Sequence, residues 1–249
     1  MYAYFFYFQR IDCADSLPLP KSANPQNADT DLRPISLTPV LSKILESFIF
    51  KWNSEIIFPH VDSNQYGNVK GCSTTHGRVH LIHQWFAATD KPHTVILSCM
   101  IDLSKAFYTI DHNILLNKLQ RLGVHPLFIH WCADVLQHRY LRVILGSFKS
   151  SWNAVHAGVP QGTKLGQLFL LVMINDLTTR TPIYKYADDC STFEFTAITH
   201  ISHLQVGLNE ICNWITTNNM QLNYKMTKEL RISFLKQSPT FDHLLANGT

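Results

Sequence analysis

The chain of 249 residues is poor in charge and has no long apolar segment. Asp, Glu, Lys and Arg make up 16% of it against 46% hydrophobic residues, and the formal net charge at pH 7 is +3. This composition is typical of a folded protein with a sizeable core and excludes a disordered chain. The mild positive charge permits a local basic groove for nucleic acid but does not predict one.

Sequence signatures of secreted, zinc-binding and membrane proteins are also missing. The cysteines are scattered, with no C-x-x-C pair, which favours reduced thiols in an intracellular protein over a disulfide framework or a zinc module. No apolar run approaches the roughly 20 residues that span a bilayer. The apolar start, 1–8, lacks a basic n-region and a small-residue cleavage site. We therefore expect no signal peptide and no membrane segment.

Two adjacent carboxylates, Asp188 and Asp189, follow the short aromatic run 184–186. Strands are expected at 183–186 and 191–195, which places the pair at a hairpin tip. Extended neighbours point to opposite faces, but at a turn both carboxylates can approach one cation. Taken alone, such a pair is more often a solvated surface turn than a metal site.

A further acid, Asp102, follows the apolar run 95–101, which is typical of a strand buried on both faces. If this strand and the hairpin share a sheet, their carboxylates can meet. Acids so placed could hold two divalent ions that activate a 3′-hydroxyl and stabilise a pyrophosphate leaving group. Magnesium is the expected ion because it prefers oxygen ligands and is held by one or two carboxylates plus substrate phosphates.

The remaining pattern predicts a mixed α/β chain. A glycine-rich stretch, 158–166, leads into a helix from 167 to about 177 that is apolar all round and therefore buried. Thr38 is the predicted N-cap of another helix, with Pro39 in its first turn and an end near Lys51. Further helices are expected at 75–88, 112–122, 126–138 and around 204–215, a hairpin at 141–145 and 149–155, and a last strand at 230–235.

These elements carry a series of motifs that resembles the reverse transcriptase domain of non-LTR (LINE-like) retrotransposons. The order and spacing match across about 17–236, with a further similarity at Leu222-Asn223 and Thr227-Lys228. The motifs are Arg33-Pro34-Ile35-Ser36, Gln65-Tyr66-Gly67, Asp102-Leu103-Ser104-Lys105-Ala106-Phe107, Gly158-Val159-Pro160-Gln161-Gly162 and Tyr186-Ala187-Asp188-Asp189.

The resemblance implies a fold and a domain layout. It implies an α/β (α+β) right-hand polymerase with fingers and palm, the palm being an antiparallel sheet backed by helices. We expect fingers at about 17–95 and 113–155 and palm at about 96–112 and 156–236. Residues 1–16 then form an unassigned leader, and 237–249 form a tail in which the thumb is missing or truncated.

The resemblance also implies roles for single residues. Asp102 and Asp188 would be the main catalytic metal ligands, supported by Asp189 and the backbone carbonyl of Leu103. Phe107 would be a steric gate that excludes a ribonucleotide 2′-hydroxyl, although a ring there could equally be core packing. The other nucleotide-binding residues would be Gln161 and Gly162, with Arg33 and Lys70 at the triphosphate.

The activity implied is RNA-directed DNA synthesis with two Mg²⁺ ions, for which Mn²⁺ could substitute. The implied partners are an RNA template, a DNA primer and dNTPs, with no membrane. Target-primed integration in the family implies a nuclear location, for which the sequence has no clear basic import signal. Phe107 argues against a template-directed RNA polymerase, the other activity that shares the palm.

Several departures from the family pattern leave an alternative open. Tyr108 stands where these enzymes usually carry a second aspartate, and Lys164 and Gln167 replace residues that are commonly apolar and proline. The alternative is therefore a catalytically inactive, truncated retroelement remnant that folds or binds nucleic acid without polymerising.

Overall fold

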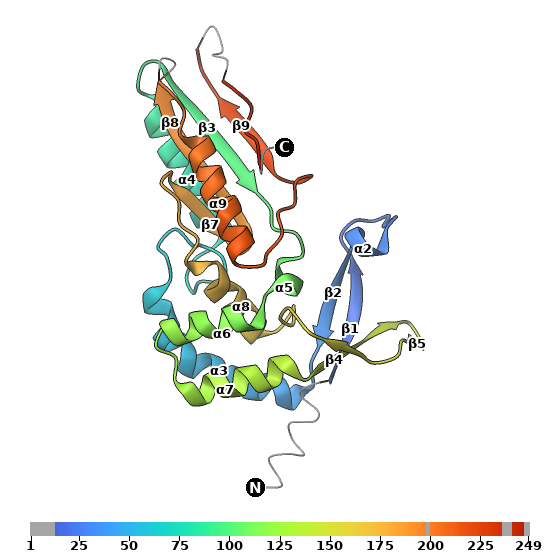
Figure 1. The fold of residues 1–249 in the computed structure, drawn as a ribbon. Helices are drawn as coiled ribbons and strands as arrows, with labels where there is room; N and C mark the ends of the chain where they lie inside the picture. Colours follow the sequence, from blue (N-terminus) through green and yellow to red (C-terminus); the bar gives the residue numbers. More distant parts are fainter. Residues whose placement is uncertain (1–12, 198–199, 236–240, 247–249) are drawn as a thin grey trace. The chain divides into compact units, whose positions relative to one another are not determined.

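The computed structural model describes residues 13–197, 200–235 and 241–246. Most of the predicted leader and much of the predicted tail lie outside these ranges. The chain divides into two compact units, residues 1–60 with 107–173 and residues 61–106 with 174–249. Figure 1 labels their helices and strands.

The first unit contains a five-stranded sheet. Strand β1 (Cys13–Pro20) pairs antiparallel with β2 (Leu32–Leu37) and parallel with β4 (Arg139–Leu145). The short strands β5 (Phe148–Lys149) and β6 (Asn153–Val155) both pair antiparallel with β4, which confirms the predicted hairpin. A short helix, α2 (Ala28–Asp31), precedes β2. The strand at 32–37 was not predicted; Pro34 keeps the residue before it out of helical geometry, which is compatible with a strand.

The other helices of the first unit are α3 (Val40–Ile57), the 3₁₀ turn η1 (Phe58–His60), most of the short α5 (Ala106–Thr109), α6 (His112–Arg121), α7 (Pro126–Gln137) and most of α8 (Lys164–Asn175). The helix expected at 112–122 is confirmed as α6, and Asp111 is its N-cap, because its carboxylate accepts hydrogen bonds from the backbone N–H groups of Asn113 and Ile114. The predicted start of α3 is wrong by one residue. Pro39 keeps an extended ψ of 152° and is itself the N-cap, which leaves Thr38 outside the helix.

The predicted burial of α8 is confirmed. Its side chains from Leu168 to Ile174 are at most 3% exposed. The helix begins three residues earlier than expected, because the Thr163 hydroxyl accepts a hydrogen bond from the backbone N–H of Gly166. This is the N-cap arrangement.

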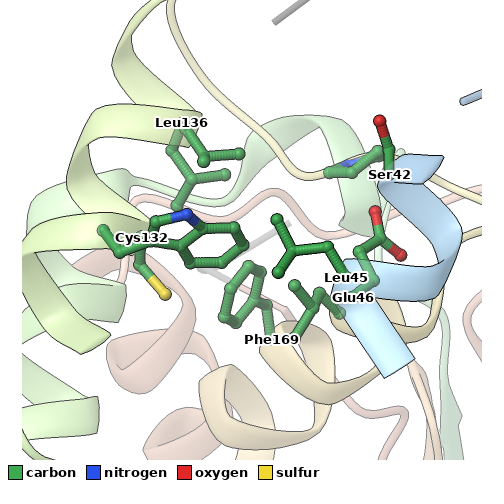
Figure 2. Close-up of a pocket in the computed structure, with 10 residues that line it drawn as sticks. Ser42, Leu45, Glu46, Cys132, Leu136 and Phe169 are labelled. Carbon is green, nitrogen blue, oxygen red and sulfur yellow. The ribbon is translucent and has the colours of Figure 1, made fainter. Parts of the chain in front are cut away.

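Helices α3, α7 and α8 pack closely within the first unit (Figure 2). Leu45, Cys132, Leu136 and Phe169 converge on a cavity of about 20 Å³, room for about one water molecule. Glu46 lies at its edge on α3 and accepts hydrogen bonds from the backbone N–H groups that open α8. A carboxylate at a helix N-terminus complements the helix dipole. The glycine-rich stretch that precedes α8 is thereby anchored at its end.

The second unit is built on a four-stranded antiparallel sheet with strand order β7-β8-β3-β9. Its strands are β3 (Thr94–Ile101), β7 (Ile183–Tyr186), β8 (Asp189–Ala197) and β9 (Lys228–Ile232). The expected burial of β3 is confirmed, since residues 95–99 are all buried. Two helices, α4 (Thr74–Thr89) and α9 (Leu204–Thr217), pack against this sheet. An antiparallel sheet backed by helices is the predicted palm.

The two helices cover opposite faces of the sheet (Figure 1). Trp85 of α4 makes an edge contact with Phe193, which pairs with Ser98 of β3. On the other face, Cys99 lies close enough to Cys212 of α9 for the two thiols to influence each other electrostatically. Adjacent strand residues point to opposite faces, so each residue of β3 can be assigned to one side. None of the helices in the described ranges is both long and apolar enough to cross a membrane.

Candidate active site

The register of the second unit brings two of the predicted acids together. Ile101 pairs with Cys190, so the next positions, Asp102 and Asp189, are neighbours across β3 and β8. By alternation both lie on the face opposite to Ile101 and Cys190. Asp188 directly precedes Asp189 and lies in the two-residue turn between β7 and β8, whose first residue, Ala187, has a left-handed φ of 53°. The predicted hairpin tip is therefore confirmed.

The carboxylates make this end of the sheet electrostatically negative. The pKa of Asp189 is raised by partial desolvation of its carboxylate and, next, by the negative charge of Asp102. Burial raises the pKa of the Cys190 thiol to about 12, and the charges of Asp188 and Asp189 act in the same direction against the lowering effect of Lys185. A divalent cation would relieve the repulsion between these like charges.

Asn223 holds Asp102 in place, a role that sequence reasoning missed. Its side-chain N–H donates to the Asp102 carboxylate at 2.6 Å, and its backbone N–H donates to the Asp102 carbonyl at 2.9 Å. These two hydrogen bonds fix the orientation of the Asp102 carboxylate and the path of its backbone. The similarity at Leu222-Asn223 was the available signal, but a motif position alone does not reveal which acid it contacts.

The same segment orients Leu103. Leu103 forms an isolated antiparallel bridge with Leu222, and the hydrogen bonds around it are made by Asp102 and Ser104. In such a pair the groups of the central residue point away from the partner strand. The Leu103 carbonyl is therefore directed away from 221–223 and is not consumed by that pairing.

The donor set fits a divalent ion that is completed by substrate. Within the ranges that the structure describes, no group of three or more His, Cys, Asp or Glu side chains is arranged to hold a metal by itself. Carboxylate oxygens are the ligands that Mg²⁺ prefers, and it usually keeps waters and substrate phosphates as its other ligands. A pair of neighbouring carboxylates at a strand end is adequate for that type of site.

In the first unit, the glycine-rich stretch lies directly against the segment that carries Phe107. The backbone N–H of Val159 donates to the Phe107 carbonyl at 2.7 Å, and that of Gly158 donates to Ile110 at 2.8 Å. A Cβ at Gly158 would lie 2.6 Å from the Cα of Tyr108, and its φ is +79°. Both the close approach and the left-handed backbone require glycine at this position.

Tyr108 connects three of the motifs in the first unit. Its hydroxyl contacts the Pro34 carbonyl and lies 2.7 Å from the Gln161 side-chain oxygen. The Gln161 carbonyl accepts the backbone N–H of Ser36 at 2.9 Å. Burial raises the pKa of Tyr108 to about 12, so the hydroxyl keeps its proton as a donor. The tyrosine that departs from the family pattern is thus a bridge between β2 and Gln161.

The other predicted nucleotide-binding residues are distributed over both units. In the first, Gly162 packs against Ile35 of β2, and Arg33 lies exposed on the same strand. In the second, Lys70 is exposed between two residues with left-handed φ, Asn68 and Gly71. Both cations are exposed, so a phosphate group could reach them from solvent.

Comparison with known proteins decides the family. Residues 20–241 match the sequence family described as reverse transcriptase (RNA-dependent DNA polymerase). This chain belongs to that family. The match covers nearly all of the range over which the motifs resemble a reverse transcriptase domain.

Among curated proteins, this reverse transcriptase chain is similar to polymerases of mobile elements in Drosophila melanogaster. It is 27% identical over 235 residues to the RNA-directed DNA polymerase from mobile element jockey, covering 87% of the chain and 25% of the relative. It is 29% identical over 176 residues to the probable RNA-directed DNA polymerase from transposon BS, covering 69% and 19%. These matches confirm the resemblance to non-LTR retrotransposons. The chain spans about a quarter or less of the length of these relatives.

Solved structures confirm the fold of the reverse transcriptase domain. Telomerase from Candida tropicalis with a telomeric RNA fragment aligns with a TM-score of 0.61 at 11% identity, covering 89% of this chain and 41% of that one. Telomerase from Candida albicans aligns with a TM-score of 0.57, also at 11% identity, covering 95% and 44%. The predicted fingers-and-palm polymerase fold is therefore correct.

Proposed function

We propose that this chain catalyses RNA-directed DNA synthesis by transferring a deoxynucleotide from a dNTP to a primer 3′ end. The observation that carries the proposal is the register of β3 and β8, which makes Asp102 and Asp189 neighbours on one face beside the turn that contains Asp188. A cluster of carboxylates at strand ends is what nucleotidyl transfer with divalent metals requires.

In this proposal Asp102, Asp188 and Asp189 hold two Mg²⁺ ions, for which Mn²⁺ can substitute, together with the Leu103 carbonyl. Bound there, the ions would activate the primer hydroxyl and neutralise charge on the departing pyrophosphate. The chain's own contribution is orientation. Asn223 orients the Asp102 carboxylate by a hydrogen bond, and the register of β3 and β8 keeps Asp189 beside it.

Nucleotide selection is assigned to the first unit. Gln161 and Gly162 bind the incoming nucleotide, and Phe107 excludes a 2′-hydroxyl by contact with the sugar. Hydrogen bonds from Val159 to the Phe107 backbone and from Ser36 to that of Gln161 give both residues fixed positions. The exposed cations Arg33 and Lys70 contact the triphosphate.

The proposed partners are an RNA template, a DNA primer and dNTPs, and the test is primer extension. The purified chain, an RNA template with a labelled DNA primer, dNTPs and Mg²⁺ or Mn²⁺ should give extended product. Asp188→Asn removes a carboxylate with little change in volume and should abolish extension. Asp134→Asn is the matched control, because Asp134 lies exposed on α7 and is assigned no role in the site.

Three results would contradict the proposal in different ways. Absence of extension with either metal would favour the inactive remnant, for which retained binding of the template–primer would then be the remaining property. Extension that survives Asp188→Asn would refute the assignment of the acids. An activity that required ribonucleotides instead of dNTPs would refute the role of Phe107.

A further inference from the structure

A completely buried lysine lies directly before the acidic turn. Lys185 is on β7, three residues from Asp188, and its side chain is 0% exposed. Burying an ammonium group is costly unless it is paired and hydrogen-bonded. A position on a sheet strand next to a buried helix would ordinarily be filled by an apolar side chain. The charge therefore calls for an explanation.

The ammonium group is fully surrounded by acceptors within the second unit. Its nitrogen lies 2.6 Å from the Asp62 carboxylate and donates to the carbonyls of Asn175 at 3.1 Å and Leu177 at 3.0 Å. These carbonyls belong to the end of α8 and the residues just after it, where the helix dipole is negative. Asp62 is further held by its backbone N–H, which donates to the Asn175 side chain at 2.8 Å. The lysine thus joins the end of α8, the segment that begins at Asp62, and β7.

The segment from Asp62 reaches the turn itself. The backbone N–H of Lys185 donates to the Asn64 carbonyl, and the Lys185 carbonyl accepts the N–H of Tyr66, both at 2.9 Å. Gln65, the residue after Asn64, contacts the turn with its side chain: its side-chain oxygen accepts the backbone N–H of Ala187 at 3.0 Å. Gln65 therefore holds the left-handed residue that immediately precedes the acids.

This segment and the turn are in direct backbone contact. The Gln65 side-chain oxygen also accepts the N–H of Gly67 at 2.8 Å, and a Cβ at Gly67 would lie 2.1 Å from the Ala187 nitrogen. Because the two backbones touch, any shift of 62–67 is transmitted to the turn. The ion pair between Lys185 and Asp62 fixes the start of 62–67, beside the backbone hydrogen bonds that Lys185 makes to Asn64 and Tyr66.

We propose that Lys185 is a positioning residue for the acidic turn: its ion pair with Asp62 fixes segment 62–67, which through Gln65 and Gly67 sets the directions of Asp188 and Asp189. This deepens the proposed function and rests on it for its catalytic consequence. Its structural consequence is that the backbone N–H of Ala187 stays hydrogen-bonded to Gln65, and this can be measured whether or not the chain is active.

The test compares a single and a double variant. Lys185→Met has a similar length and leaves the Asp62 carboxylate, whose side chain is only 18% exposed, without its ion-pair partner. Lys185→Met combined with Asp62→Asn removes both charges and keeps the side-chain oxygen that accepts the Asn64 N–H at 3.0 Å. Removing both charges restores thermal stability relative to the single variant, because no unpaired charge stays buried. Leu208→Ala is the control for a general loss of stability, because Leu208 is a buried residue of α9.

Two readouts separate positioning from stability. Hydrogen exchange followed on a peptide that spans 184–189 should be faster at the turn in both Lys185 variants, and not selectively faster in the Leu208→Ala variant. With template, primer and dNTPs, kcat should fall about ten-fold or more in both Lys185 variants, as for other groups that orient metal ligands. The KM for dNTP should change less than about two-fold, since the nucleotide-binding residues are not altered.

The outcomes are distinguishable from a failure of the proposed function. A double variant with wild-type exchange at the turn and wild-type kcat would overturn the positioning role, as would equal effects in the Leu208→Ala variant. If the wild-type chain does not extend a primer, the proposed function fails. The exchange measurement then still decides: faster exchange at 184–189 supports the proposal and unchanged exchange overturns it.

Discussion

Replacing Gly158 by alanine should damage the first unit far more than its size suggests. The added methyl group would lie 2.6 Å from the Cα of Tyr108 and 2.7 Å from the Phe107 carbonyl oxygen, and φ at this position is +79°. The left-handed backbone costs an L residue about 1–2 kcal/mol. The contact with backbone atoms adds about 1–3 kcal/mol, because the chain must move to admit the group.

Gly123 is a matched control in the same unit. Its φ is also +79°, but an added Cβ would meet nothing within 4 Å. Gly123→Ala therefore has only the backbone cost, while Gly158→Ala has the backbone cost and the steric cost. With about 2–4 °C per kcal/mol for a chain of this size, the midpoint of thermal unfolding should fall by about 2–8 °C for Gly123→Ala and by about 4–20 °C for Gly158→Ala.

Calorimetry on the two variants tests the magnitude, and dNTP selectivity tests the consequence. Gly158→Ala should also increase ribonucleotide incorporation, because the displaced backbone is the one that accepts the Val159 hydrogen bond and carries Phe107. Equal losses of stability in the two variants would refute the steric reasoning. A destabilised Gly158→Ala variant with unchanged sugar selectivity would refute the role of this contact in positioning Phe107.

Three further predictions follow from single contacts. Burial raises the pKa of Glu46 above its usual 4.5, so the folded state binds that proton more tightly than the unfolded state and the stability falls as pH rises from 4.5 through the raised pKa. Glu46→Gln cannot ionise and should therefore gain thermal stability relative to wild type between pH 4.5 and pH 7. A difference in thermal stability that is independent of pH would contradict this. Asn223→Ala removes the donor to Asp102. The substitution should lower kcat about 10–100-fold and raise the Mg²⁺ concentration needed for half-maximal rate. An unchanged Mg²⁺ requirement in a titration would refute the role of this hydrogen bond in orienting Asp102. Tyr108→Phe leaves the side-chain oxygen of Gln161 without its donor. The substitution should cost about 1 kcal/mol of stability and raise the KM for dNTP. A wild-type KM in steady-state kinetics would mean that the hydroxyl does not position Gln161.

Much of the second unit was predictable because its signals are local. The apolar run of β3 reports burial on both faces, and the polar residues that follow mark its end, so Asp102 could be placed at a strand end without a structure. The aromatic run and the acid pair likewise identified a hairpin. The first unit was harder to predict from sequence. Strand β2 was not predicted, because it contains a proline and its apolar and polar residues do not alternate regularly.

The sequence by itself determined the family, the order of the motifs and the elements that carry the acids, because these depend on residue type, spacing and periodicity along the chain. Only the tertiary structure decided which groups meet. Strand register makes Asp189 the direct neighbour of Asp102, and long-range hydrogen bonds link Asn223 to Asp102 and Tyr108 to Gln161. The pairing of Lys185 with Asp62 joins positions 123 residues apart along the chain (185 − 62). Such pairings have no local signature, since they depend on where folding places segments that are remote in sequence.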